Sequence, residues 1–325
     1  MMRRLKTLLA GAAVLLGIAS AAPAKAEEIS VTHWGSLMYG VPYAVAMEKG
    51  FFKKAGIDIT GILSSKGGGT TMRNVLAGGL PYGEVALSAV IAASREGIDL
   101  RIVNSGVQTV ADALWVTMPN SDIKTVKDLV GKKMSITSPK SVTDMLSIMV
   151  LEKEGIPLDK VERPALGGIG SGLTALESGA VQAAAIFDPI WSARREKYRP
   201  VFFVKDVLPP MTQTVGVTTA EFARQHPDKL RAIIAGRRAG VDFIYANPKE
   251  AAAIFAKEYN LKPDVAENAI NNMAQIKYWS PGNFDLKGMN EMTRGLKIIG
   301  EVKEDVDWGK LIDRSFLPAD LRGST

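Results

Sequence analysis

The glycine-rich segment Ser64-Ser65-Lys66-Gly67-Gly68-Gly69-Thr70-Thr71 carries residue types that can bind a polar ligand. It follows an extended apolar run at 57–63 and leads into the helical spacing of 70–77, which predicts a strand–loop–helix junction. Glycines let a ligand approach the backbone, threonine hydroxyls donate hydrogen bonds, and the positive end of a helix favours a negative or strongly polar group. A tight turn explains the glycines equally well. As a binding loop, the segment predicts ligand contacts from Gly68, Gly69 and Thr70.

Aromatic side chains flank the loop that follows the first predicted strand. Trp34 and Tyr39 could stack on a ligand there, and either could equally belong to the core. Two hydroxyl side chains lie at comparable places further along the chain. Ser88 ends a later predicted strand, and Thr214 lies in an extended segment after a pair of prolines. We include all four residues among the predicted ligand contacts.

Three more hydroxyl side chains gather at the start of a helix predicted at 142–154. They are Ser138, Ser141 and Thr143. Helix capping accounts for one of the three hydroxyls but not readily for all of them. We therefore expect this second helix start to face the ligand from the side opposite the glycine-rich loop.

Charged residues near these loops give conflicting indications about the ligand. Asp188 and Pro189 together form an ideal pair for the start of a helix. Helix capping is therefore one explanation for Asp188. If Asp188 instead faces the ligand, it favours a hydrogen-bond donor such as an amine or a ring N–H. Lys66 and Arg73 would favour an anion, or they are solvated surface charges. The sequence does not rank these alternatives.

The composition excludes several classes of chemistry. The chain has no cysteine, so thiol catalysis, thiolate zinc sites and iron–sulfur clusters are ruled out, and its two histidines do not predict a metal site. The dinucleotide-like Gly170-Ser171-Gly172 has no convincing strand before it, and the glycine-rich segment lacks the residue order of a P-loop. No Ser/His/Asp set is apparent. We predict no enzyme, no catalytic residue, no cofactor and no metal.

The N-terminal segment 1–26 has the features of a secretory signal peptide. Basic residues precede the apolar run 8–22, and Ala24-Lys25-Ala26 places small residues at the cleavage position. Four of the 40 basic residues lie in this segment, so the remainder has 36 Lys and Arg against 34 Asp and Glu. Because no basic block with interleaved aromatic residues remains, nucleic-acid binding is not predicted. We expect a monomeric exported protein, cleaved near Ala26.

Alternating strand and helix patterns predict an α/β fold with mainly parallel sheets and helices on both faces. Strands are predicted at 29–34, 57–63, 84–88, 100–104, 113–118, 133–137, 182–187 and 201–204. Helices are predicted at 41–54, 70–77, 142–154, 173–178, 189–197, 219–225, 228–246, 248–258 and 263–275. The predicted organisation is a signal peptide, a first part of lobe 1 (27–111), lobe 2 (112–210), and a return to lobe 1 with C-terminal helices (211–325). Hinges are expected near 110–113 and 209–214, with a ligand cleft between the lobes.

Four stretches of the sequence carry a family pattern. Residues 42–59 read PYAVAMEKGFFKKAGIDI, and three further stretches follow at 126–133, 176–189 and 226–251. Together they resemble the nitrate/sulfonate/taurine-type (thiamine-precursor-like) substrate-binding proteins of bacterial ABC importers, in the family's order. The segment 79–84, GLPYGE, departs from the pattern, because an Asp commonly follows the Leu-x-x-Gly that precedes the third strand.

The resemblance implies a two-lobed periplasmic binding protein of the type II fold. Such a protein closes on a small polar or anionic organic solute and delivers it to an ABC permease in the inner membrane. Two alternatives remain open. One is an enzyme of the same fold related to thiamine-pyrimidine synthesis, against which the missing cysteines and the export signal argue. The other is a ligand-sensing partner of a membrane receptor.

Overall fold

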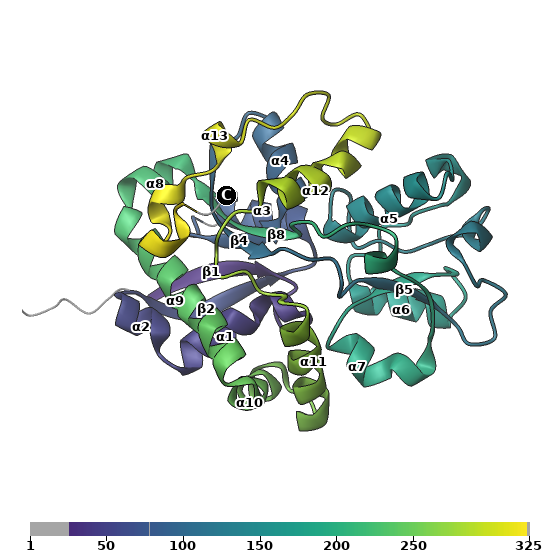
Figure 1. Cartoon of the computed structure of the whole chain (residues 1–325), viewed down its shortest axis with the longest axis horizontal. Helices are drawn as coiled ribbons and strands as arrows, with labels where there is room; N and C mark the ends of the chain where they lie inside the picture. Colours follow the sequence, from purple (N-terminus) through teal and green to yellow (C-terminus); the bar gives the residue numbers. More distant parts are fainter. Residues whose placement is uncertain (1–25, 78, 324–325) are drawn as a thin grey trace, which may run out of the picture.

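A computed structural model describes residues 26–77 and 79–323 (Figure 1). The predicted signal peptide therefore lies, except for Ala26, outside the described residues. Within the described ranges, no helix is both long and apolar enough to cross a membrane.

The first sheet contains five strands in the order β2-β1-β3-β8-β4. β1 (Ala26–Thr32) pairs in parallel with β2 (Asp58–Ser65) and with β3 (Gly83–Ala86). β8 (Thr214–Thr219) lies antiparallel between β3 and β4 (Leu100–Val107). We call this sheet and its helices the first lobe.

The second sheet contains three strands in the order β6-β5-β7, and it forms the second lobe with its own helices. β5 (Leu114–Thr117) is antiparallel to both β6 (Ala184–Ile186) and β7 (Arg199–Phe203). The α/β fold class is confirmed, but the prediction of mainly parallel pairing is wrong here and at β8. Both β5 and β8 begin where the chain has just crossed between the lobes, so they enter their sheets against the direction of their neighbours.

Three helix boundaries in the first lobe differ from the predicted ones. The helix predicted at 41–54 is divided into α1 (Val41–Glu48) and α2 (Phe51–Ala55), because Gly50 adopts the left-handed conformation with φ +66°. α3 (Gly68–Ala77) begins inside the glycine-rich segment rather than after it. α4 (Leu87–Arg95) begins within the strand predicted at 84–88, so Ser88 is helical.

The second lobe contains α5 (Val142–Lys153), α6 (Ile169–Glu177) and α7 (Ile190–Arg194). The strand predicted at 133–137 is not a strand. Its residues form isolated parallel bridges that alternate between two neighbours, namely Lys133 with Glu162, Met134 with Ala183, and Ile136 with Ala165. Because no two successive residues pair with the same neighbour, no continuous ladder forms.

The C-terminal third of the chain is helical, as predicted, and it returns to the first lobe. Its helices are α8 (Ala220–Gln225), α9 (Pro227–Ala246), α10 (Pro248–Tyr259), α11 (Pro263–Gln275), α12 (Leu286–Ile298) and α13 (Trp308–Leu311). Figure 1 shows α11 beside α7 and α12 beside α5, so two of these helices reach the second lobe, in agreement with their contacts.

Two segments connect the lobes, 108–113 between β4 and β5 and 204–213 between β7 and β8. The segment that follows α11 runs along both of them. Trp279 forms a β-bridge with Val107 at the end of β4, and Gln108 of the first crossing donates to the carbonyl of Asn283 (2.6 Å). At the second crossing, the Thr212 amide donates to the carbonyl of Gly288, at the start of α12 (3.0 Å). The region between the lobes is therefore built from three lengths of chain that are far apart in the sequence.

Candidate functional site

A narrow cavity lies between the lobes, at the strand ends of both sheets. The first lobe contributes the loop after β1, the start of α3, the end of β3 and the start of β8. The second lobe contributes the segment before α5, the start of α6 and the residue that follows β6. Ligands in open α/β folds bind at such strand ends, so this cavity is the candidate site.

Three helix starts reach the cavity, through Gly68 of α3, Val142 of α5 and Ile169 of α6. The first amide groups of a helix have no partner within it, and each helix start carries a partial positive charge of about half an elementary charge. No Lys or Arg lines the cavity in the described part of the chain. Main-chain groups rather than cationic side chains are thus available to a negative or acceptor group.

Hydroxyl side chains line the same region and bond to one another. Thr143 Oγ1 lies 3.0 Å from Thr137 Oγ1 and 2.9 Å from Ser141 Oγ. Ser141 Oγ also accepts the Asp144 amide at 3.2 Å and so caps α5. Capping therefore uses one of these hydroxyls, as the sequence suggested, and the others remain beside the cavity.

His33 lines the cavity and was missed as a ligand contact in the sequence. Its backbone is left-handed, with φ +57°, and burial lowers the pKa of its imidazole to about 4, so the ring is neutral at neutral pH. No hydrogen bond is made by this imidazole within the described ranges. A lone histidine after a strand gives no signal of such a role, because its orientation depends on how the turn folds.

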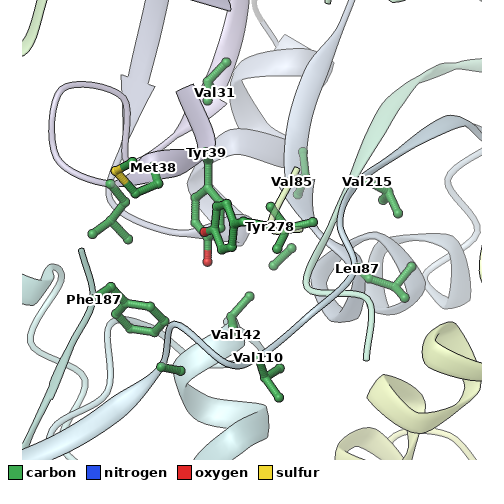
Figure 2. Close-up of a cluster of buried hydrophobic side chains, with 14 of the residues drawn as sticks. Val31, Met38, Tyr39, Val85, Leu87, Val110, Val142, Phe187, Val215 and Tyr278 are labelled. Carbon is green, nitrogen blue, oxygen red and sulfur yellow. The ribbon is translucent and has the colours of Figure 1, made fainter. Parts of the chain in front are cut away.

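Tyr39 connects the cavity to both crossing segments. Its hydroxyl donates to Gln213 Oε1 (2.8 Å), and Gln213 Nε2 donates to Asp112 Oδ1 (2.6 Å). Figure 2 shows the Tyr39 ring parallel to that of Tyr278, with ring centroids 6.2 Å apart, and Phe187 across the gap. Burial raises the pKa of Asp112 to about 7. One residue from each crossing is therefore bonded, directly or through Gln213, to a side chain of the cavity wall.

A buried ion pair supports the opposite wall. Thr214, which lines the cavity, donates to Glu84 Oε1 (2.9 Å), and Glu84 Oε2 accepts from Tyr43 (2.6 Å) and from Arg237 Nε (3.2 Å). Both members of the Glu84–Arg237 pair are essentially inaccessible to solvent. Burial is the largest single influence and lowers the pKa of Arg237, but Glu84, Tyr43 and Tyr82 together outweigh it and hold that pKa above its ordinary value. Arg237 also donates to two main-chain carbonyls, which fixes this wall.

The structure brings five of the predicted contacts together around the cavity. They are Tyr39, Gly68, Ser141, Thr143 and Thr214. They come from the loop after β1, the start of α3, the start of α5 and the start of β8, which lie far apart in the sequence.

Other predicted contacts lie outside the cavity. Trp34 packs edge-on against Tyr259, with ring centroids 5.3 Å apart. Thr70 Oγ1 accepts from Arg73 (3.0 Å). Gly69 lines a separate groove on the far side of α3.

The remaining predicted residues form or flank contacts between the lobes. Ser88 Oγ donates to the carbonyl of Lys140 (2.7 Å). Asp188 Oδ1 accepts the Ser192 amide (2.9 Å) and its Oδ2 accepts from Asn272 of α11 (3.2 Å), so it caps α7 and joins the lobes. Ser138 Oγ is buried without a hydrogen-bond partner among the described residues.

Two α/β lobes joined by two crossings, with a cavity at the facing strand ends, define the periplasmic-binding-protein fold. The chain belongs to the family described as NMT1/THI5 like, whose model matches residues 38–251. The resemblance noted in the sequence at 42–59 and in the later stretches is confirmed. A search of the curated proteins gave no significant match.

Solved structures with the same fold share little sequence with this chain. The alkanesulfonate-binding protein SsuA from Xanthomonas axonopodis pv. citri is 17% identical, with a TM-score of 0.75 over 91% of this chain and 100% of its own. The periplasmic nitrate-binding protein NrtA from Synechocystis PCC 6803 is 13% identical, with a TM-score of 0.74 over 93% and 92%. The desulfurization enzyme DSZB is 13% identical, with a TM-score of 0.62 over 89% and 97%.

Proposed function

We propose that this protein is a periplasmic solute-binding protein, which captures a small polar or anionic organic solute between its lobes and delivers it to an ABC permease. The observation that carries the proposal is the cavity, to which both lobes contribute helix starts and hydroxyls. The solute-binding relatives SsuA and NrtA support the same role. We further propose that 1–26 is a cleaved signal peptide and that the mature protein is a monomer in the periplasm.

Closure of the lobes is the proposed mechanism of capture. Ser88 and Lys140 bond across the lobes near one end of the cleft, and Asn272 and Asp188 bond across them near the other end. These contacts form only when the lobes are together, so they stabilise the closed state that a bound solute selects. The crossings bear the hinge motion, and the Tyr39–Gln213–Asp112 bonds connect them to the solute site.

A thermal-shift screen of residues 27–325 tests the proposal. A solute that binds only the folded protein raises the melting temperature by mass action, by an amount that grows with its concentration. Organic carboxylates, sulfonates, nitrate, amines and pyrimidines form the panel. A protein whose melting temperature is unchanged by every class is not a binding protein for such solutes.

Gly67→Ala is expected to weaken solute affinity at least about tenfold while leaving each lobe folded. A Cβ atom on Gly67 would lie 2.6 Å from Ser138 Oγ of the other lobe, but 3.5 Å from Ser138 Cβ. Gly67→Ala combined with Ser138→Ala should therefore recover affinity, measured by calorimetry with the best solute of the screen.

The matched control for this pair is Gly97→Ala. Gly97 also has a positive φ, +88°, but nothing lies within 4 Å of its Cβ position. The Gly97→Ala variant reproduces backbone strain without a clash between lobes. Its affinity for the solute should therefore stay near that of the wild type. If Ser138→Ala fails to recover the affinity of Gly67→Ala, contact between these loops does not control closure.

An enzyme is the second candidate, favoured by the similarity to DSZB and by the unpartnered His33 imidazole in the cavity. The two candidates differ in the fate of the solute. If the protein only binds its solute, the solute should be recovered intact. Its NMR spectrum, after long incubation and denaturation of the protein, should match the spectrum taken before incubation. A new product that forms in proportion to protein concentration would establish turnover instead.

A further inference from the structure

Four buried side chains form a closed circuit of hydrogen bonds behind the cavity wall. Tyr39 lines the cavity and donates to Gln213 Oε1 (2.8 Å), and Gln213 Nε2 donates to Asp112 Oδ1 (2.6 Å). The Tyr278 hydroxyl is a hydrogen-bond partner of both the Asp112 carboxyl and the Tyr39 hydroxyl, and its aromatic ring stacks on that of Tyr39 (Figure 2). We call these four side chains the Asp112 network.

The number of protons in the Asp112 network limits how its members can bond. Both amide protons of Gln213 are used, one by Asp112 and one by the carbonyl of Thr109. The Tyr39 proton is used by Gln213. The single proton of Tyr278 therefore serves two acceptors, the Asp112 carboxyl and the Tyr39 oxygen. When Asp112 is ionised, the carboxylate takes this proton, because a charge-assisted bond is the stronger one, and the Tyr39 oxygen loses its donor.

One added proton on Asp112 completes the circuit. Asp112 then donates to Tyr278, Tyr278 to Tyr39, Tyr39 to Gln213, and Gln213 to Asp112, so each side chain both donates and accepts. Hydrogen bonds that run in one direction through a buried network strengthen one another. Burial also raises the pKa of Asp112 to about 7, so both protonation states are accessible near neutral pH.

Charged groups from other elements act on the Asp112 network. Asp188, which follows β6, raises the pKa of Asp112, and Glu84 of β3 raises the pKa of both tyrosines. Glu84 is paired with Arg237. His33 lines the same cavity, but burial lowers its pKa to about 4, so its imidazole stays neutral above pH 6. Of the two groups, Asp112 is therefore the one that changes charge near neutral pH.

The charge of Asp112 reaches the cavity through Tyr39. The Asp112 carboxylate raises the pKa of the Tyr39 hydroxyl, which shows that its field extends to the cavity wall. An anion in the cavity is separated from Asp112 by this one layer of side chains, and water is excluded from the layer, so the two like charges repel. Protonation of Asp112 removes the repulsion. By linkage, a bound anion must also favour the protonated form of Asp112.

We propose, resting on the proposed function, that the Asp112 network is a proton switch and that an anionic solute enters the cavity together with one proton, which Asp112 takes from the solvent. Tyr39 is the contact between the solute and the switch. Capture is then stronger in an acidic medium, and a rise in pH favours release.

A titration without solute tests the switch itself. In residues 27–325 labelled with carbon-13 at the aspartate carboxyls, the NMR resonance of Asp112 is identified by its absence from Asp112→Asn. Its midpoint is expected near pH 7. In Tyr39→Phe the Tyr278 proton has no second acceptor and stays with the Asp112 carboxylate. The midpoint should therefore fall by about one pH unit, equivalent to about a tenfold loss of proton affinity.

The matched control for Tyr39→Phe is Tyr259→Phe. Tyr259 is also buried, and its hydroxyl bonds to none of the four side chains. This variant should leave the midpoint of Asp112 unchanged. If burial alone sets the midpoint, Tyr39→Phe removes a polar atom and leaves the midpoint unchanged or raises it. Either of those results, or an equal fall in Tyr259→Phe, overturns the switch.

Calorimetry with sodium nitrate and with sodium methanesulfonate tests the link to binding. Both anions are conjugate bases of strong acids, so any proton exchanged on binding belongs to the protein. At pH 7, buffers of different ionisation enthalpy should reveal the uptake of about half a proton per bound anion. Affinity should fall at least about tenfold from pH 6 to pH 9, as the free protein loses the Asp112 proton. Asp112→Asn should keep the affinity that it has at pH 6 across this range.

The outcomes separate this inference from the proposed function. An anion that binds with the same affinity at pH 6 and pH 9, or without proton uptake, overturns the proton-linked capture while solute binding stands. Failure of both anions to bind at pH 6 also overturns it. The thermal-shift panel, which includes neutral and cationic solutes, then decides whether the proposed function falls as well.

Discussion

Replacing Arg237 by methionine is expected to destabilise the protein by about 3–5 kcal/mol. Arg237 and Glu84 form an ion pair that is closed to solvent, and loss of the guanidinium leaves a buried carboxylate without its counter-charge. The carbonyls of Ser280 and Gly106 also lose their donor. Urea unfolding at neutral pH measures the change in the free energy of unfolding.

Two further variants make this prediction specific. Adding Glu84→Gln to Arg237→Met removes the uncompensated charge and keeps one of the two acceptor oxygens that Thr214 and Tyr43 use, so part of the stability should return. Arg238→Met, on the same helix, breaks partly exposed pairs with Asp242 and Asp320 and should cost no more than about 1 kcal/mol. If the double variant is as unstable as Arg237→Met, the cost comes from lost packing and main-chain bonds rather than from the charge.

Replacing Asp112 by asparagine is expected to stabilise the protein by roughly 2–4 kcal/mol above neutral pH and by little near pH 4. Burial raises the pKa of Asp112 from 3.8 to about 7, so the native protein holds a proton that the unfolded chain has released. The stability that Asp112 contributes is therefore complete below about pH 4 and is lost as the pH rises through 7. Asparagine resembles the protonated acid and has no charge to bury.

His33 makes the wild-type pH profile informative. Burial lowers its pKa from 6.5 to about 4, so its contribution to stability is present above pH 6.5 and is lost as the pH falls toward 4. The two groups oppose each other between these values, and the wild type should be nearly flat there. In the Asp112→Asn variant only the contribution of His33 remains. The free energy of unfolding of this variant should therefore rise with pH across the same range. A constant difference between the two proteins in urea unfolding from about pH 4 to pH 8.5 contradicts a protonated Asp112.

Local patterns were sufficient for much of the fold. The spacing at 142–154 predicted α5, and Ser141 caps it as its residue type and position suggest. Hydrophobic periodicity and capping act over a few residues, so they can be read without knowing what the segment packs against. Strand direction cannot be read in this way. β8 pairs with strands more than a hundred residues earlier, and its reversal follows from the path of the crossing.

The sequence by itself predicted a binding region of hydroxyls and glycines at helix starts, five of which line one cavity in the structure, and its family pattern indicated the class of protein. Only the tertiary structure decided which side chains face the cavity. Ser88 and Asp188 have their polar atoms engaged between the lobes, whereas His33 faces the cavity and Asp112 lies behind Tyr39 at the crossings. The physical reason is that partners far apart in the chain compete for each polar group, and folding alone sets which of them come within hydrogen-bond distance.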